Sequence, residues 1–145
     1  MIAIQKFRNE AGVIYATLVY QPVKNYLLMR WIGNSSEDEV KRASMGMMQW
    51  QKNEGQAKKC RFHVHDTKEM QGAWIGVVDW IRDEMWPFCY QCGLRYNISV
   101  TSPDLFSKMS SIALKKQNSN QVTTVLFETL PAAESWLTEK YKSLN

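Results

Sequence analysis

Polar residues on two candidate strands are the first feature of this sequence that could do chemistry. Arg61, His63 and His65 alternate with apolar residues, so their side chains share one face of a strand. Arg95 and Asn97 alternate in the same way on the next candidate strand. If that face is open, the five residues form a cationic, pH-responsive surface that could hold an anionic ligand or the acidic edge of a protein partner. A solvated sheet face and a homodimer contact are the alternatives.

A cysteine pair is the second candidate. Cys89 and Cys92 form a C-x-x-C, a spacing found in zinc sites and in redox-active dithiols, and Cys60 with the two histidines could supply further soft ligands. Zinc ribbons usually carry a second such pair, which is missing here. The pair also follows Pro87 and does not open a helix, where a thiol pKa would be lowered. The alternative is two small apolar side chains in a connecting loop.

Other signatures of catalysis are missing. The sequence contains no P-loop, dinucleotide fingerprint, nucleophile elbow or H-E-x-x-H. We therefore expect no catalytic residue, no cofactor and no resident metal, and predict that the chain is not an enzyme. The net charge is +4 and the pI about 9.0, but the basic residues are scattered, so no nucleic-acid partner is expected.

Length and composition favour one domain over residues 1–145. No stretch approaches the roughly 18–20 apolar residues that cross a bilayer, so membrane insertion is not expected. The first residues carry no apolar leader, and three cysteines without a secretion signal favour a reducing compartment. We therefore predict a cytoplasmic protein.

Hydrophobic periodicity predicts the element order ββαβαβαβα. Strands are predicted over residues 12–20, 26–32, 60–66, 94–101 and 122–127, and a polar loop over 117–121. The first helix buries Val40, Ala43, Met47 and Trp50 and ends near Gly55, and the second buries Trp74, Val78, Ile81 and Met85 and is ended by Pro87. The third opens at Ser102-Pro103-Asp104 and turns Leu105, Met109 and Ile112 inward, and the last buries Ala133, Trp136 and Leu137.

This order indicates an α/β fold with a mixed five-stranded sheet, in which the first strand is antiparallel and the rest are parallel. The third and fourth strands alternate polar and apolar residues, whereas a sheet covered on both faces has nearly continuous apolar strands. We therefore expect the helices mainly on one face, with the polar face uncovered.

Several short motifs resemble the SpoIIAA-like (STAS-type) family over about residues 13–137. They are Trp31-x-Gly33, Asp66, Trp80-Ile81, Trp86-Pro87 and Phe127-x-x-x-x-Ala132-Ala133-x-x-Trp136-Leu137. The resemblance implies a βα superhelix shared with anti-sigma-factor antagonists and, more remotely, with CRAL-TRIO lipid-binding domains. Phosphoswitch members carry a serine at the start of the second helix, whereas residues 69–73 have no hydroxyl and Thr67 comes several residues early. The resemblance therefore does not extend to a kinase-driven switch.

The leading hypothesis is a non-enzymatic cytosolic binding or regulatory module that acts through protein–protein contacts or as a homodimer. The alternative is a carrier or sensor of a small apolar or anionic ligand. Trp50, Trp74, Trp136, Met47 and Met85 could wall a lipid pocket by analogy with the CRAL-TRIO relatives, although their helical spacing equally predicts ordinary core packing. A third hypothesis is an enzyme that uses Cys89 and Cys92.

Overall fold

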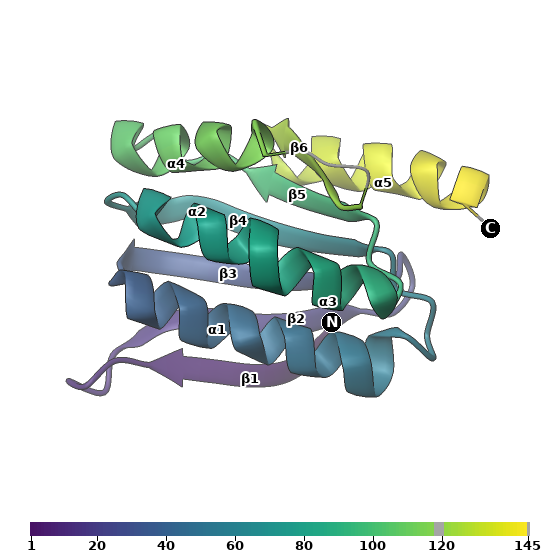
Figure 1. The fold of residues 1–145 in the computed structure, drawn as a ribbon, viewed down its shortest axis with the longest axis horizontal. Helices are drawn as coiled ribbons and strands as arrows, with labels where there is room; N and C mark the ends of the chain where they lie inside the picture. The colour runs from purple at the N-terminus through teal and green to yellow at the C-terminus, as the bar shows by residue number, and fades with distance from the viewer. Residues whose placement is uncertain (118–120, 145) are drawn as a thin grey trace.

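A six-stranded sheet runs in sequence order from β1 to β6 in this computed structural model, which describes residues 1–117 and 121–144 (Figure 1). The strands are β1 (Ile2–Arg8), β2 (Ile14–Gln21), β3 (Tyr26–Asn34), β4 (Phe62–Gln71), β5 (Tyr96–Val100) and β6 (Thr123–Phe127). β1, β2 and β3 pair antiparallel, and β3 to β6 pair parallel. The α/β class and the change from antiparallel to parallel pairing are as predicted.

The prediction of five strands was wrong, because the N-terminal segment forms the edge strand β1. Only Phe7 is buried in this strand, and its register with β2 shifts twice, between Ala3 and Gln5 and between Phe7 and Arg8. A strand with one buried side chain and two irregularities does not show the two-residue apolar period by which strands are recognised.

Helix α1 (Glu37–Trp50) covers the sheet next to β1 and β2. Its capping box is complete, because Ser36 Oγ accepts from the backbone N–H of Glu39 at 3.1 Å and Glu39 Oε1 accepts from the N–H of Ser36 at 2.9 Å. The helix continues through a π-helical turn (Gln51–Gly55), close to the predicted end. The four residues predicted to face inward are all buried: Val40, Ala43, Met47 and Trp50.

The second helical segment is one continuous rod, called here the 75–91 rod. It consists of a 3₁₀ turn (Ile75–Val77), α2 (Val78–Trp80), a π-helical turn (Ile81–Met85) and α3 (Trp86–Gln91). The expectation that Pro87 ends this helix was wrong. Pro87 stands in the first turn of α3, directly after the π-helical turn, where the change in hydrogen-bond register accommodates a residue without an N–H.

Two further helices follow β5 and β6. Helix α4 (Leu105–Lys115) begins later than predicted, with Asp104 as its N-cap, whose Oδ2 accepts from the N–H of Ser107 at 3.0 Å and of Gly72 at 3.1 Å. Helix α5 (Leu130–Leu144) closes the chain. Within the predicted loop over 117–121, residues 118–120 lie outside the described part of the chain.

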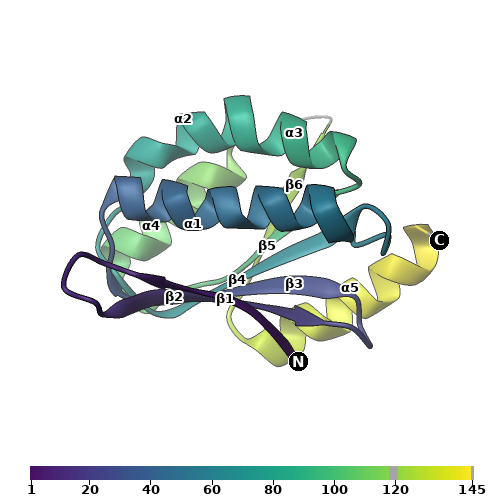
Figure 2. The same ribbon diagram turned by 90° about the horizontal axis from the view of Figure 1, so that it is seen from below.

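The helices form two unequal layers (Figure 2). α1, the 75–91 rod and α4 lie on one face of the sheet, which we call the helix-rich face, and α5 covers the other. Most helices therefore gather on one face, as predicted, but it is the face of His63, His65 and Asn97, which was expected to be uncovered.

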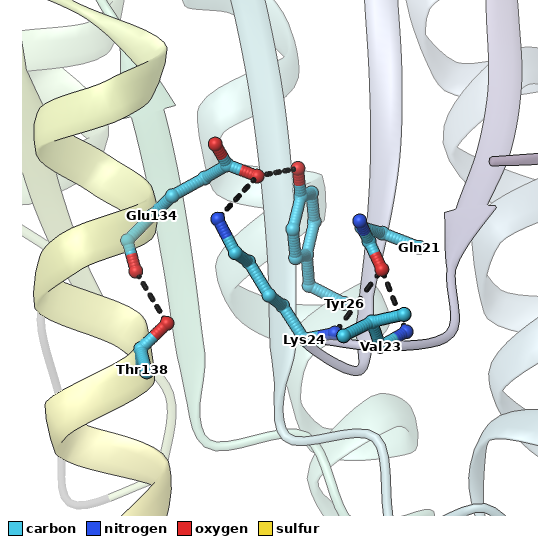
Figure 3. A network of polar contacts seen from close by, with 6 residues as sticks. All are labelled: Gln21, Val23, Lys24, Tyr26, Glu134 and Thr138. Atoms are coloured by element: carbon cyan, nitrogen blue, oxygen red, sulfur yellow. Dashed lines mark hydrogen bonds and ion pairs between the residues drawn. The ribbon is translucent and has the colours of Figure 1, made fainter.

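Helix α5 is attached to the turn between β2 and β3 by a polar network (Figure 3). Tyr26 Oη donates to Glu134 Oε2 at 2.7 Å, and Lys24 Nζ lies 3.5 Å from the same oxygen. Burial, followed by the bond to Glu134, raises the pKa of Tyr26. Gln21 Oε1 accepts from the backbone N–H groups of Val23 and Lys24 and so shapes the turn. The network holds α5 over the apolar side chains of β3, β4 and β5.

Candidate functional site

The five polar residues predicted to form an open surface lie on the helix-rich face. His63 pairs with Asn97 and His65 with Ser99 across β4 and β5, so the histidines and the asparagine share a face as expected. That face is covered, since His63 is 1% exposed and Asn97 is 3% exposed. The expectation of an uncovered polar face was therefore wrong. Alternation identifies which residues share a face, but α5 packs on the apolar side of these strands and the larger helical layer packs on the polar side.

His63 is held by Gln51, in the π-helical turn after α1. The Gln51 side-chain amide donates to the carbonyl oxygens of Cys60 and Cys92, both at 2.9 Å, which turns its Oε1 toward His63 Nε2 at 2.8 Å. His63 Nε2 must therefore carry the proton, and the buried Nδ1 has no partner among the described residues. Burial, with a smaller effect of His65, lowers the pKa of His63 to about 3. The ring is neutral at physiological pH.

His65 is also held neutral, in a chain of polar side chains across the sheet. Trp31 Nε1 donates to His65 Nδ1 at 3.1 Å, and the two rings are nearly parallel, with centroids 6.1 Å apart. Burial lowers the pKa of His65 to about 4, against an opposing hydrogen-bond contribution from Asn97. Asn97 Nδ2 donates to Thr124 Oγ1 at 3.2 Å. These contacts stabilise the core and leave neither histidine as a free cation.

The two arginines of the predicted surface bond to backbone near the end of α3. Arg61 donates to the carbonyl oxygen of Gly93 at 3.1 Å. Arg95 donates to the carbonyl oxygens of Tyr90 at 2.9 Å and of Leu94 at 2.8 Å, and its guanidinium lies 3.9 Å from the centre of the Tyr90 ring. Both side chains are half-buried and connect the rod to the starts of β4 and β5. Together with the burial of His63 and Asn97, this argues against an anion site on this surface.

The cysteine pair lies at the end of the rod. Cys89 is in α3 and Cys92 caps its C-terminus. The prediction that the pair lies in a connecting loop was therefore wrong. All three cysteines are free and buried, and burial raises the pKa of Cys89 and raises that of Cys60 to about 12. Within residues 1–117 and 121–144, no group of three or more His, Cys, Asp or Glu side chains could hold a metal ion.

A small cavity lies in the middle of the helix-rich face. Its volume of about 30 Å³ is room for about two water molecules. One polar group at its wall, Trp74 Nε1, has no hydrogen-bond partner in the described part of the chain, and Ser44 and Ser99 also line the cavity. The remaining wall is mostly aromatic and sulfur-containing, from Trp31, Trp86, Met70 and Met85. The cavity joins the predicted polar residues to the tryptophan-rich core, but it is far smaller than an ordinary ligand pocket.

Helix α4 is oriented opposite to the prediction. The residues expected inside are exposed, and serines take their place. The exposed fractions are 64% for Leu105, 61% for Phe106, 53% for Met109 and 38% for Ile112, whereas Ser107, Ser110, Ser111 and Leu114 are at most 4% exposed. Ile75, at the start of the rod that contacts α4, is also 57% exposed. We call the exposed set Ile75, Leu105, Phe106, Met109 and Ile112 the α4 apolar face.

Short polar contacts hold α4 in this orientation. The backbone N–H of Trp74 donates to Ser110 Oγ at 3.0 Å, and Ser110 Oγ donates to the carbonyl oxygen of Phe106 at 3.2 Å. Small serines let the helix approach the sheet and the rod closely. The signal in the sequence was a second helical stripe at positions 107, 110, 111 and 114, which competes with the apolar stripe at 105, 109 and 112.

Comparisons with protein-family models, with curated proteins and with solved structures find no match for this chain. None of the helices in the described ranges is both long and apolar enough to cross a membrane.

Proposed function

We propose that this chain is a non-enzymatic cytosolic interaction module that docks another protein through the α4 apolar face. The observation that carries this proposal is the inverted helix, with serines inside and large apolar side chains in water. A folded monomer gains nothing from exposing four such side chains on one helix, because each would be more stable out of water. Contiguous exposed apolar patches of this kind typically mark protein interaction sites.

The side chains that could take part in catalysis are instead committed to the core, which supports a binding role. The two histidines are neutral and hydrogen-bonded within the core, and the arginines hold backbone carbonyls. The thiols of Cys60 and Cys89 are buried with raised pKa values. A rigid core with an apolar docking helix is the construction expected of a module that recognises a partner and does not transform a substrate.

Site-specific photo-crosslinking in cells that make this protein tests the proposal. A photoreactive phenylalanine analogue at Met109 is expected to give discrete crosslinks to protein. The same group at Val23, which is 88% exposed on the β2–β3 turn, serves as the matched control and is expected to give none of these products. Absence of protein crosslinks at Met109, or identical products at both positions, contradicts the proposal.

We further propose that this module belongs to the SpoIIAA-like (STAS-type) family. Support comes from the sequential order of β3 to β6, with three successive connections on one face of the sheet. Residues 69–73, which match the family's phosphorylated segment, begin at the end of β4, and the hydroxyl of Thr67 before them is buried and donates to the carbonyl oxygen of Val100 at 2.6 Å. We therefore expect regulation by occupancy of the docking face and not by phosphorylation at this position.

A small-ligand carrier is the second candidate, and the unpartnered Nε1 of Trp74 at the cavity wall favours it. Trp74 Nε1, Ser44 and Ser99 would hold the polar end of a ligand, while Met70 and Met85 would move to enlarge the space. Native mass spectrometry of protein purified from its own host distinguishes the two candidates. A stoichiometric small molecule that is lost in Ser99→Val supports the carrier, and a mass equal to the bare chain argues against it.

A further inference from the structure

We propose that the occupant of the α4 apolar face is a helix of a partner protein whose apolar stripe is bordered by acidic side chains. The proposal rests on the function proposed above and adds the chemistry of the partner. It follows from the spacing of the apolar residues, from the charges along one edge of α4, and from the charges on the neighbouring rod.

The spacing of the exposed residues suits a helix. Leu105, Met109 and Ile112 stand at i, i+4 and i+7, so they form one ridge along α4. Phe106 and Ile75 extend the apolar surface sideways to the start of the rod. Ridges of this kind pack into the grooves between the side chains of a second helix. An added strand would need a free sheet edge, and α4 offers none.

The charges along α4 define the border of the surface. Lys108 and Lys115 are seven residues apart and lie on the same edge of the helix, and both are exposed. Neither forms an ion pair within the described ranges. The best match for two free cations beside an apolar ridge is a partner helix with carboxylates beside its own ridge. Attraction between these opposite charges would steer and orient docking.

A second copy of this chain fits the same surface less well. The α4 sequence from Leu105 to Lys115 contains no carboxylate, so two α4 helices packed together offer the lysine edge no acidic partner. The rod beside α4 carries the exposed carboxylates of Asp79 and Asp83, but both pair with Arg82, at 3.2 and 2.7 Å, so they are not free to meet the lysine edge of a second copy. Their neighbour Arg82 connects the rod to the end of α4, donating to Gln117 Oε1 at 3.0 Å.

A pair of synthetic amphipathic helices of about 18 residues tests the proposal with the full chain. Both peptides carry the same leucine stripe, bordered by glutamates in one and by lysines in its twin. Fluorescence anisotropy is expected to show tighter binding of the glutamate peptide by about two- to thirtyfold, the effect of two exposed ion pairs. The difference should shrink in about 0.5 M salt.

Charge reversal on the protein provides the decisive comparison. The double variant Lys108→Glu, Lys115→Glu is expected to reverse the preference and bind the lysine peptide more tightly. Lys6→Glu with Lys52→Glu changes the net charge equally at exposed positions on β1 and the turn after α1, and should keep the original preference. Circular dichroism of each variant verifies the fold.

The outcomes separate this inference from the proposed function. If both peptides bind equally and Phe106→Ser with Met109→Ser abolishes binding of both, the docking face stands and the acidic partner is wrong. If neither peptide binds but the same apolar substitutions dissolve a dimer seen by light scattering, or release the protein from phosphatidylserine vesicles, the occupant is a second copy or a membrane and the inference is overturned. If the apolar substitutions change nothing, both proposals fail.

Discussion

His63 Nε2 donates a hydrogen bond to Gln51 Oε1 at 2.8 Å, across the interface between β4 and the turn that follows α1. This contact connects the two parts of the helix-rich core, because the same glutamine amide also bonds the carbonyl oxygens of Cys60 and Cys92. A buried polar network is stabilising only when its members are satisfied, and this one leaves only His63 Nδ1 without a partner in the described ranges.

Replacing Gln51 by leucine should destabilise the protein strongly. The substitution leaves the His63 N–H and two buried carbonyl oxygens without partners, and each unsatisfied group costs about 1–3 kcal/mol. We expect a fall of about 2–5 kcal/mol in the free energy of unfolding, measured with urea. Gln49→Leu, exposed on the same helix, should stay within about 0.5 kcal/mol of the wild type. A small effect of Gln51→Leu would show that the network is not a structural requirement.

Stability should fall as the pH is lowered from neutral. Burial lowers the pKa values of His63 and His65 in the folded protein to about 3 and about 4, below the unfolded value of about 6.5. The unfolded chain therefore takes up protons first, so the stabilisation is complete above about pH 6.5 and is lost as the pH falls toward the folded values. The free energy of unfolding should decrease by up to about 1.4 kcal/mol per pH unit for each histidine.

Urea unfolding between about pH 7 and pH 5 measures this slope before the carboxylates begin to titrate. The double variant Gln51→Leu, His63→Leu removes one histidine together with its partner and should lose about half of the slope. A flat profile in the wild type would mean that the histidines are accessible to protons in the folded state.

Because of the orientation of α4, we expect two similar truncations on this helix to have very different effects on the free energy of unfolding. Leu114→Ala should cost about 2–5 kcal/mol, because Leu114 is 4% exposed and its loss leaves a cavity. Met109→Ala should change the free energy of unfolding by less than about 0.5 kcal/mol, because its side chain is in water. The inverse result would place α4 in the orientation that the apolar stripe predicts.

The buried thiols should react slowly in the folded protein. Burial raises the pKa of Cys60 to about 12 and also raises that of Cys89, so little thiolate is present at neutral pH. With Ellman's reagent at about pH 8, these two thiols should react at least about 100-fold more slowly than in urea. Fast labelling of Cys89 in the native state would instead favour the hypothesis of an enzyme that uses the cysteine pair.

The contact between β1 and α1 depends on the glycine at position 46. A Cβ built at Gly46 would lie 2.6 Å from Cζ of Phe7, the only buried side chain of β1. Gly46→Ala should therefore cost about 1–3 kcal/mol through overpacking, partly offset by the higher helix propensity of alanine. Phe7→Leu in the same chain should recover part of the loss, measured as a double-mutant cycle. Additive effects would show that the two residues do not touch.

Local patterns in the sequence determined most of the secondary structure. The inward stripe of α1 and the alternation in β4 and β5 were predicted because each depends on residues close together in the chain. The same patterns placed His63, His65 and Asn97 on a common face. Pro87 and the N-terminal strand were misjudged, since a π-helical turn and an edge strand with one buried residue leave little periodic signal.

Which face is covered was decided only by the tertiary structure. The alternation in β4 and β5 is the same whether the histidine side meets water or helices. Two tertiary contacts decide which side the helices cover. Gln51, which is 12 residues from His63 in the chain, bonds the histidine side, and α5, which follows the last strand, covers the apolar side. For the same reason α4 could turn either of its two stripes inward. The serine stripe faces in because Ser110 bonds the backbone of Trp74, a contact that the sequence does not reveal.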